Sequence, residues 1–109
     1  MGHYMQRVFV TRAKAGQLKG DHAHRRCAQL LVCVSGRIQV VCDDGRGFRE
    51  HLLDDMSPGL LIPPGVWAKQ YVLEDDAVLI VLCDRGFEVE DYIRDYDEFR
   101  AFLVSASTR

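Results

Sequence analysis

The stretch Lys19-Gly20-Asp21-His22-Ala23-His24-Arg25, followed by Gln29 and closed by Gly36, decides how this chain folds. Two of the chain's four histidines, His22 and His24, lie in this stretch with a single residue between them. On a β-strand, residues i and i+2 point to the same face. The spacing therefore predicts a pocket lined by two imidazoles. By itself it leaves open whether that pocket holds a metal ion, a substrate or only packed side chains.

The composition excludes several classes of protein. A length of 109 residues fits one domain spanning residues 1–109, and 48% hydrophobic residues can form a real core. The net charge of -2 shows no basic excess of the kind that nucleic-acid binding needs. With no signal peptide and no long apolar run, we expect a soluble, cytoplasmic protein without a membrane segment. We place no function in residues 1–5.

The four cysteines are Cys27, Cys33, Cys42 and Cys83, and no pair has the CxxC spacing of a zinc or redox site. Three of them lie inside apolar, strand-like runs, where a free cysteine behaves as a small buried hydrophobic residue. We therefore expect reduced thiols in the core.

Most of the chain alternates short apolar runs with turn residues. We expect strands at 6–11, 21–24, 29–35, 37–42, 48–53, 60–62, 66–73 and 77–83, with a loop at 12–20 and a hairpin turn at 43–45. About eight short strands at this spacing predict an all-β sandwich or barrel. From residue 91 on, apolar residues recur at helical spacing, so we expect a turn at 91–94 and a helix at 96–104 whose Tyr/Phe stripe packs on the sheet.

The order Gly16, His22, His24, Gln29, Gly36 resembles the first motif of the cupin superfamily of small β-barrels and jelly rolls, and residues 59–68 resemble the second motif. In metal cupins, two histidines and a glutamate of the first motif join a histidine of the second. Here Gln29 stands at the glutamate position and Ala68 at the last histidine position. A divalent metal prefers three or four protein ligands, so we expect no metal and no cofactor.

Without a metal, two imidazoles facing one pocket suggest proton transfer, because histidine titrates near neutral pH. The alternative is that both histidines are structural residues of a cupin that has lost its metal. Their position in the motif, beside Lys19, Arg25 and Gln29, favours a functional role.

Within the cupins, the chain resembles the nucleotide-sugar 3,4-ketoisomerases over nearly its whole length from Arg7 on. The matching segments include Arg7-Val8-Phe9-Val10, residues 19–25, and Asp91-Tyr92-Ile93-Arg94. The resemblance implies isomerisation of dTDP-4-keto-6-deoxyglucose to its 3-keto isomer, for deoxysugar biosynthesis, with a dTDP-linked keto-sugar as the binding partner. It also implies His24 as the base and His22 as a partner that orients it or relays protons.

The same resemblance suggests which residues bind the substrate. Gln29 would donate to the developing oxyanion, and Lys19 and Arg25 are candidate contacts to the pyrophosphate or the pocket wall. Period-2 alternation puts Gln70 on the face of Ala68, so Gln70 is expected to reach the cavity, while Trp67 shares the opposite face with Lys69 and Tyr71. Trp67 is also a candidate substrate contact, because it belongs to the family's Trp-His pair.

The chain departs from the family pattern at several points. Family members usually begin with one or two further strands that help form their dimer, whereas the first strand expected here is at 6–11. The Trp-His pair is Trp67-Ala68, a tyrosine of the family is Phe9 or Val10 here, and Lys19 replaces an arginine. We expect a homo-oligomer, a dimer, because an uncovered strand edge invites pairing.

Two alternatives to the isomerase stay open. One is a catalytically weak or inactive cupin that binds a nucleotide sugar or serves as an accessory domain. The other is a metal-dependent cupin oxygenase or epimerase, which would contain stoichiometric metal.

Overall fold

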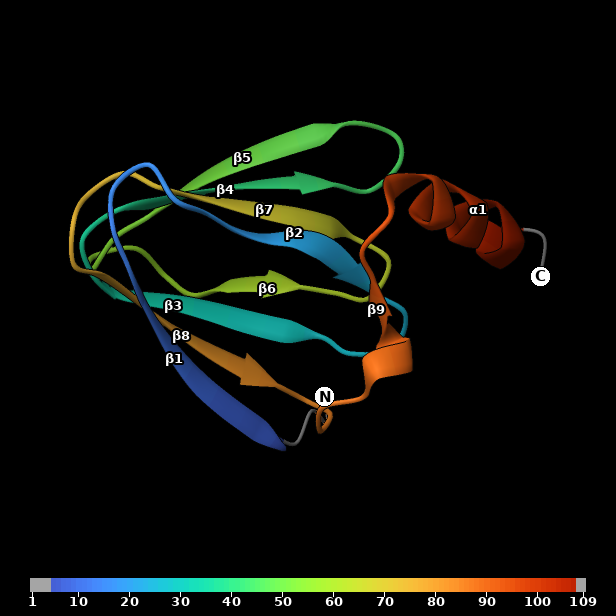
Figure 1. Ribbon diagram of the computed structural model, residues 1–109, viewed down its shortest axis with the longest axis horizontal. Coiled ribbons are helices and arrows are strands. Elements are labelled where there is room, and N and C mark those ends of the chain that lie inside the picture. Colours follow the sequence, from blue (N-terminus) through green and yellow to red (C-terminus); the bar gives the residue numbers. More distant parts are fainter. Residues whose placement is uncertain (1–4, 108–109) are drawn as a thin grey trace.

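The fold is two stacked antiparallel β-sheets with one C-terminal helix, as the computed structural model shows for residues 5–107 (Figure 1). One sheet has the order β1 (Arg7–Ala13), β8 (Ala77–Cys83), β3 (Gln29–Ser35), β6 (Leu60–Ile62). The other has the order β5 (Phe48–Leu53), β4 (Ile38–Asp43), β7 (Trp67–Val72), β2 (Leu18–His24), β9 (Tyr92–Ile93). A 3-10 helix, η1 (Val89–Asp91), and the helix α1 (Tyr96–Ser107) complete the chain. The expected all-β, cupin-like fold with a short C-terminal helix is confirmed.

Strict alternation of side chains builds the main core between the sheets. In β8, Leu79, Val81 and Cys83 are buried, and the residues between them face outward. The same period of two holds along β3, where Leu31 and Cys33 are buried. Inward positions of both sheets therefore meet in one apolar layer. The four cysteines are free thiols, three of them buried, as expected from the sequence.

Two strands are longer than the sequence predicts. Residues 12–20 were expected to form a loop, but β1 continues to Ala13 and β2 already begins at Leu18. The reason is strand pairing within each sheet, because Ala13 of β1 lies opposite Ala77 of β8, and Leu18 of β2 lies opposite Tyr71 of β7. Backbone hydrogen bonds to a neighbouring strand outweigh a weak local preference.

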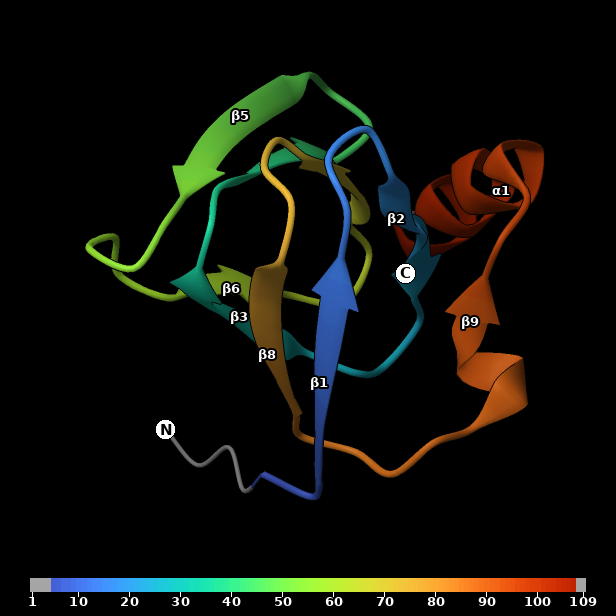
Figure 2. The ribbon, with the colours of Figure 1, turned by 60° about the vertical axis from the view of Figure 1, so that its left-hand side comes forward.

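The C-terminal part also differs in detail. Instead of a turn at 91–94, Tyr92 and Ile93 form β9, which pairs with the end of β2. The helix expected at 96–104 begins at Tyr96 as predicted and runs on to Ser107. Its Phe99 is fully buried and packs on Trp67 with ring centroids 5.6 Å apart, so the aromatic stripe is indeed packing. Figure 2 shows α1 and β9 on the same side of the molecule, beside β2.

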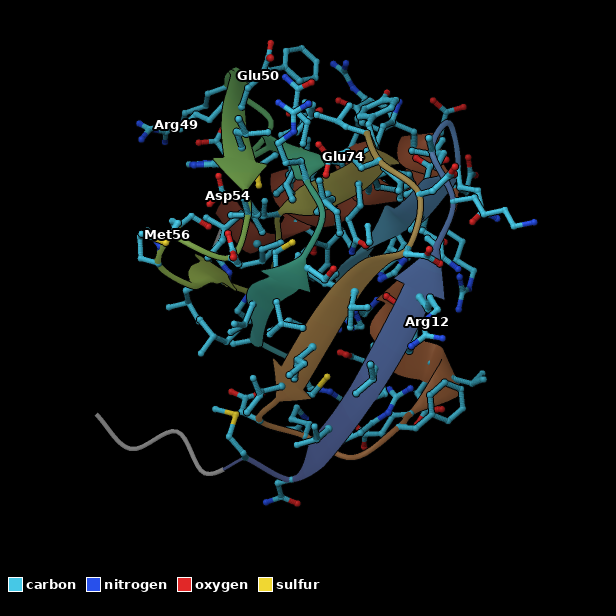
Figure 3. The ribbon with its side chains drawn as sticks, turned by 90° about the vertical axis from the view of Figure 1, so that its left-hand side faces the viewer. Arg12, Arg49, Glu50, Asp54, Met56 and Glu74 are labelled. Atoms are coloured by element: carbon cyan, nitrogen blue, oxygen red, sulfur yellow. The ribbon has the colours of Figure 1, made fainter. Side chains whose placement is uncertain are left out.

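The outward side of the four-stranded sheet is aliphatic. Val8 and Val10 on the edge strand β1 are 58% and 62% exposed, and Arg12 is the charged residue at the end of this row. Figure 3, in which β1 and β8 face the viewer, shows Arg12 on this side. We call this surface the aliphatic face; its residues are Val8, Val10, Leu30, Val32, Val34, Leu61, Val78, Ile80 and Leu82. Within residues 5–107, no helix has the length and apolar character needed to cross a membrane.

Candidate active site

The His-x-His pair lies near one end of β2, with both rings on the same side of the strand. The ring centroids of His22 and His24 are 4.9 Å apart, and the rings meet edge to face. Just before His22, β2 has an irregularity at which Asp21 adopts a left-handed backbone conformation with φ of 62°. The strand then continues, so that His22 lies opposite Ala68 of β7 and His24 lies opposite Tyr92 of β9.

The protonation state of His22 follows from its surroundings. Its Nδ1 atom lies 3.0 Å from the carbonyl oxygen of Gly20, and a carbonyl can only accept. Nδ1 therefore carries the hydrogen, and Nε2 of the neutral ring keeps its lone pair. Burial lowers the pKa of His22 to about 4, although the Gly20 hydrogen bond opposes this. The ring is therefore a neutral proton acceptor at physiological pH.

His22 lines a partly open cavity of about 180 Å³ between the two sheets. Both sheets contribute to its wall, which is formed by Phe9, Thr11, Lys19, Gly20, His22, Gln29, Gln70, Val81 and Tyr92. Of the residues selected from the sequence, four come together here: Lys19, His22, Gln29 and Gln70. Gln70 reaches the cavity because it stands two residues from Ala68 on β7, as the alternation predicts.

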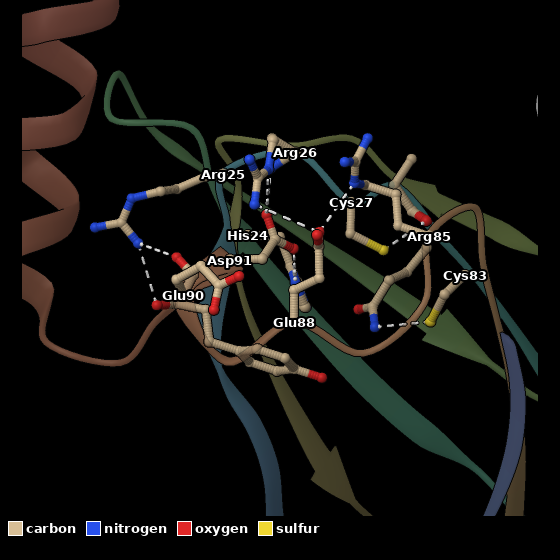
Figure 4. A network of polar contacts seen from close by, with 12 residues as sticks. His24, Arg25, Arg26, Cys27, Cys83, Arg85, Glu88, Glu90 and Asp91 are labelled. Atoms are coloured by element: carbon tan, nitrogen blue, oxygen red, sulfur yellow. Dashed lines mark hydrogen bonds and ion pairs between the residues drawn. The ribbon is translucent and has the colours of Figure 1, made fainter. Parts of the chain in front are cut away.

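His24 lies behind this wall and is paired with Asp91 (Figure 4). Its Nδ1 atom is 2.8 Å from Oδ2 of Asp91, and both side chains are buried. Burial lowers the pKa of His24, against the opposing effect of the carboxylate. Burial raises the pKa of Asp91, but hydrogen bonds from His24 and from the backbone N–H of Arg26 outweigh it, so this pKa lies below its ordinary value. The Nε2 atom of His24 is buried and has no hydrogen-bond partner among residues 5–107.

Asp91, Tyr92 and Arg7 complete this arrangement, although the sequence pattern gave them no role. Asp91 is 67 residues away from His24 in the chain, and Tyr92 is 85 residues away from Arg7, whose Nη1 donates to its hydroxyl oxygen at 3.1 Å. The available signal was the resemblance of the segments around Arg7 and Asp91-Tyr92 to the ketoisomerases, which marked them without indicating what they contact.

Two residues selected from the sequence lie elsewhere. Arg25 points toward α1 and pairs there with Glu98. Its guanidinium also donates to the carbonyl oxygens of Glu90 in η1 and Tyr92 in β9. Trp67 lies on the far side of the five-stranded sheet, and its Nε1–H donates to Asp21 at 3.0 Å. That side carries a separate cavity of about 650 Å³, to which Lys69 and Tyr71 also contribute. The structure therefore separates Arg25 and Trp67 from the cavity of His22.

The residues do not fit the metal site of a metal cupin. Ala68, opposite His22, offers no donor atom, and the amide of Gln29 donates to Sγ of Cys83 at 3.4 Å. A second group, His24, Cys27 and Asp91, has its ligand atoms within 4.8 Å of one another. However, His24 and Asp91 already hydrogen-bond each other, and burial raises the pKa of the Cys27 thiol to about 12. Neither set of residues is therefore a suitable ligand set for a divalent metal.

Two stacked sheets that enclose a pair of imidazoles define a small cupin. Comparison with known proteins places this cupin more narrowly, because the family described as "FdtA: WxcM-like, C-terminal" matches residues 2–104. A curated relative, the TDP-4-oxo-6-deoxy-alpha-D-glucose-3,4-oxoisomerase of Aneurinibacillus thermoaerophilus, is 35% identical over 96 residues, which are 88% of this chain and 69% of the relative. The chain belongs to this family, that of the cupin-type dTDP-sugar 3,4-ketoisomerases.

Solved structures agree with this assignment. A 3,4-ketoisomerase from Helicobacter canadensis is 30% identical, with a TM-score of 0.87 over 92% of this chain and 76% of its own. A mutant of the 3,4-ketoisomerase QdtA from Thermoanaerobacterium thermosaccharolyticum, in complex with TDP-4-keto-6-deoxyglucose, is 26% identical, with a TM-score of 0.87 over 93% of this chain and 74% of its own.

Proposed function

We propose that this protein converts dTDP-4-keto-6-deoxyglucose to its 3-keto isomer without a metal. The observation that carries this proposal is the neutral imidazole of His22, which keeps a lone pair on Nε2 and lines the cavity between the sheets. Two relatives support the substrate. The curated relative is named for TDP-4-oxo-6-deoxyglucose, and the Thermoanaerobacterium enzyme was solved with the corresponding TDP-4-keto sugar.

The chemistry requires proton transfers and no external oxidant. The C4 carbonyl acidifies the proton on C3, a base removes that proton, and an enediol forms between C3 and C4. When the proton is returned to C4 and the hydroxyl on C3 becomes a carbonyl, the 3-keto isomer results. One base that reaches both carbons is sufficient for the carbon-bound proton.

We assign this base to His22, whereas the sequence resemblance suggested His24. His22 lines the cavity, whereas His24 is only 6% exposed and is not among the residues that line it. His24 is then a positioning residue. Its ring is fixed by Asp91 and meets the ring of His22 edge to face, which limits how His22 can turn.

The other cavity residues suit the rest of the substrate. Gln29 and Gln70 come from opposite sheets, and their amides can donate to the oxygens of a sugar held between them. Pockets that enclose a drug-sized ligand measure about 300–1,000 Å³, so a cavity of about 180 Å³ accommodates only the sugar ring. The nucleoside diphosphate then lies outside, where Lys19 can meet a phosphate.

Deuterium exchange tests this proposal. The protein is incubated with dTDP-4-keto-6-deoxyglucose in heavy water, and NMR follows deuterium at C3 and C4 and formation of the 3-keto product. We expect both in the wild type, a loss of about 10²-fold or more in His22→Asn, and no change in His51→Asn, a histidine of β5 outside the cavity.

Other outcomes would support the alternatives. Binding of the nucleotide sugar without exchange and without product would favour a non-enzymatic cupin. One equivalent of metal in elemental analysis, together with loss of activity on chelation, would favour a metal-dependent cupin.

We also propose that a second copy of the chain covers the aliphatic face. Nine aliphatic residues on neighbouring strands form this surface, and homodimer interfaces are more apolar than ordinary protein surface. The 109 residues would act as one domain in each subunit. Four free thiols support a reducing compartment such as the cytoplasm.

A further inference from the structure

The phenol of Tyr92 lies against both imidazoles of the site. Its ring centroid is 5.1 Å from that of His22 and 4.4 Å from that of His24. Register explains this closeness, because β9 pairs with β2 and sets Tyr92 directly opposite His24. Tyr92 also forms part of the wall of the cavity that His22 faces. Tyr92 therefore lines the cavity beside the proposed base.

The guanidinium of Arg7 is hydrogen-bonded to the hydroxyl of Tyr92. Nη1 of Arg7 donates to the phenol oxygen at 3.1 Å, and a guanidinium can only donate. The phenol oxygen is the acceptor in this bond, so its own O–H remains free to donate to another group. The rings of Phe9 and Phe87, whose centroids are 4.6 and 5.2 Å from the guanidinium carbon, hold Arg7 in place. The hydrogen bond to Tyr92 raises the pKa of Arg7, so that its charge is permanent.

We propose that Tyr92 is a second catalytic residue, which moves the proton between the two sugar oxygens while His22 moves the proton between the two carbons. This proposal rests on the proposed isomerase function. It follows from the place of Tyr92 in the cavity wall, the contact of its hydroxyl with Arg7 and the closeness of its ring to that of His22.

The two residues together balance the reaction. As the bond from C3 to its proton breaks and His22 takes the proton, Tyr92 gives its hydroxyl proton to the C4 carbonyl oxygen, and the enediol forms. As His22 returns its proton to C4, the Tyr92 phenolate takes the proton of the C3 hydroxyl, and the C3 carbonyl forms. Both residues end as they began, and no electrons leave the sugar. Arg7 stabilises the negative charge that Tyr92 carries between the two steps.

The test is Tyr92→Phe, which removes one oxygen atom and keeps the ring. We expect kcat to fall about 10²-fold while KM stays close to that of the wild type, because the lost group acts on the reacting oxygens. The matched control is Tyr71→Phe, on the other side of the five-stranded sheet, which should keep wild-type kcat. Thermal unfolding of both variants shows whether the fold is intact.

Arg7 provides an independent variant. Arg7→Lys, which keeps a donor and a charge, should retain more of kcat than Arg7→Met, whereas a purely packing role would favour methionine. A Tyr92→Phe variant that is folded and as active as the wild type would overturn the role of Tyr92 and leave the proposed function standing. A wild type that neither exchanges nor isomerises the keto-sugar would overturn both.

Discussion

Nδ1 of His24 and Oδ2 of Asp91 lie 2.8 Å apart, with both side chains buried. This contact joins the end of β2 to the end of η1, two segments far apart in the chain. The carboxylate also accepts the backbone N–H of Arg26 at 2.6 Å, so both of its oxygens are used. One buried acidic group therefore fixes the ring behind the proposed base and the chain segment that follows it.

Replacing this carboxylate should cost both stability and activity. In Asp91→Asn, an NH2 group replaces one carboxylate oxygen. This group cannot accept the hydrogen of His24, so a buried hydrogen bond to a charged group is lost. We expect the free energy of unfolding to fall by about 1–3 kcal/mol and kcat to fall at least about tenfold, because His24 no longer has a fixed orientation. Urea unfolding and steady-state kinetics measure the two effects. Asp55→Asn, an exposed turn residue, is the control, and equal stability of both variants would contradict the structural role of Asp91.

The low pKa of His22 should make the fold sensitive to acid. Its pKa is about 4 in the folded protein and about 6.5 in the unfolded chain, so between these values the unfolded chain binds a proton that the folded chain does not. Stability therefore rises with pH across this window and is fully present above about 6.5. His24, whose pKa is also lowered, acts in the same direction. In His22→Gln, the loss of stability between pH 7 and pH 5 should be smaller by on the order of 1 kcal/mol.

Urea unfolding at several pH values between 4.5 and 7.5 measures this difference. His51→Gln removes a histidine from β5 and serves as the control. If His22→Gln kept the full pH dependence of the wild type, the buried neutral state of His22 would be refuted.

The turn after β3 should depend on the absence of a side chain at Gly36. This residue has φ of 74°, and an added Cβ would lie 2.8 Å from Cα of Ala77 and 2.9 Å from its Cβ. Gly36→Ala should therefore destabilise the fold by about 1–3 kcal/mol, from overpacking and backbone strain. Gly47→Ala is the matched control, because a Cβ there meets nothing within 4 Å. Equal midpoints of urea unfolding for the two variants would contradict the crowding at Gly36.

The aliphatic face should control the oligomeric state. Val10→Glu places a charge in the middle of β1 on this face, and a buried, unpaired charge is strongly unfavourable in an interface. Light scattering after size exclusion should show a dimer for the wild type and half its mass for the variant. Met56→Glu, in the loop between β5 and β6 and 86% exposed, should remain a dimer. A monomeric wild type, or a dimeric Val10→Glu, would remove this face as the contact between copies.

What depends on local periodicity could be predicted from the sequence. His22 and His24 share a side of β2, and Gln70 and Trp67 lie on opposite sides of β7, because strand residues alternate with a period of two. The number of short strands and the close spacing of the turns between them likewise predicted an all-β sandwich or barrel. The C-terminal helix followed from its apolar spacing, with Phe99 as its buried anchor.

What depends on register between distant strands could not be predicted. Which residue faces His24 is decided by the pairing of β2 with β9, a strand too short to show any periodicity. Arg25 also depends on distant contacts, because the resemblance suggested that it contacts the pyrophosphate or the pocket wall, whereas in the structure it pairs with Glu98 on α1. The order of the two imidazoles, with His22 at the cavity and His24 behind it, likewise needs the three-dimensional arrangement.

The acceptor that fixes the ring of His22 is a main-chain carbonyl, that of Gly20. No substitution at position 20 can remove this carbonyl, so the tautomer of the base depends on the backbone conformation and not on any one side chain. That path is itself constrained, because Gly20 has φ of 73° and an added Cβ would lie 3.1 Å from the carbonyl oxygen of Ala68. Side chains around the cavity can therefore change during evolution while the base keeps its orientation, as long as a glycine keeps the strand in this shape.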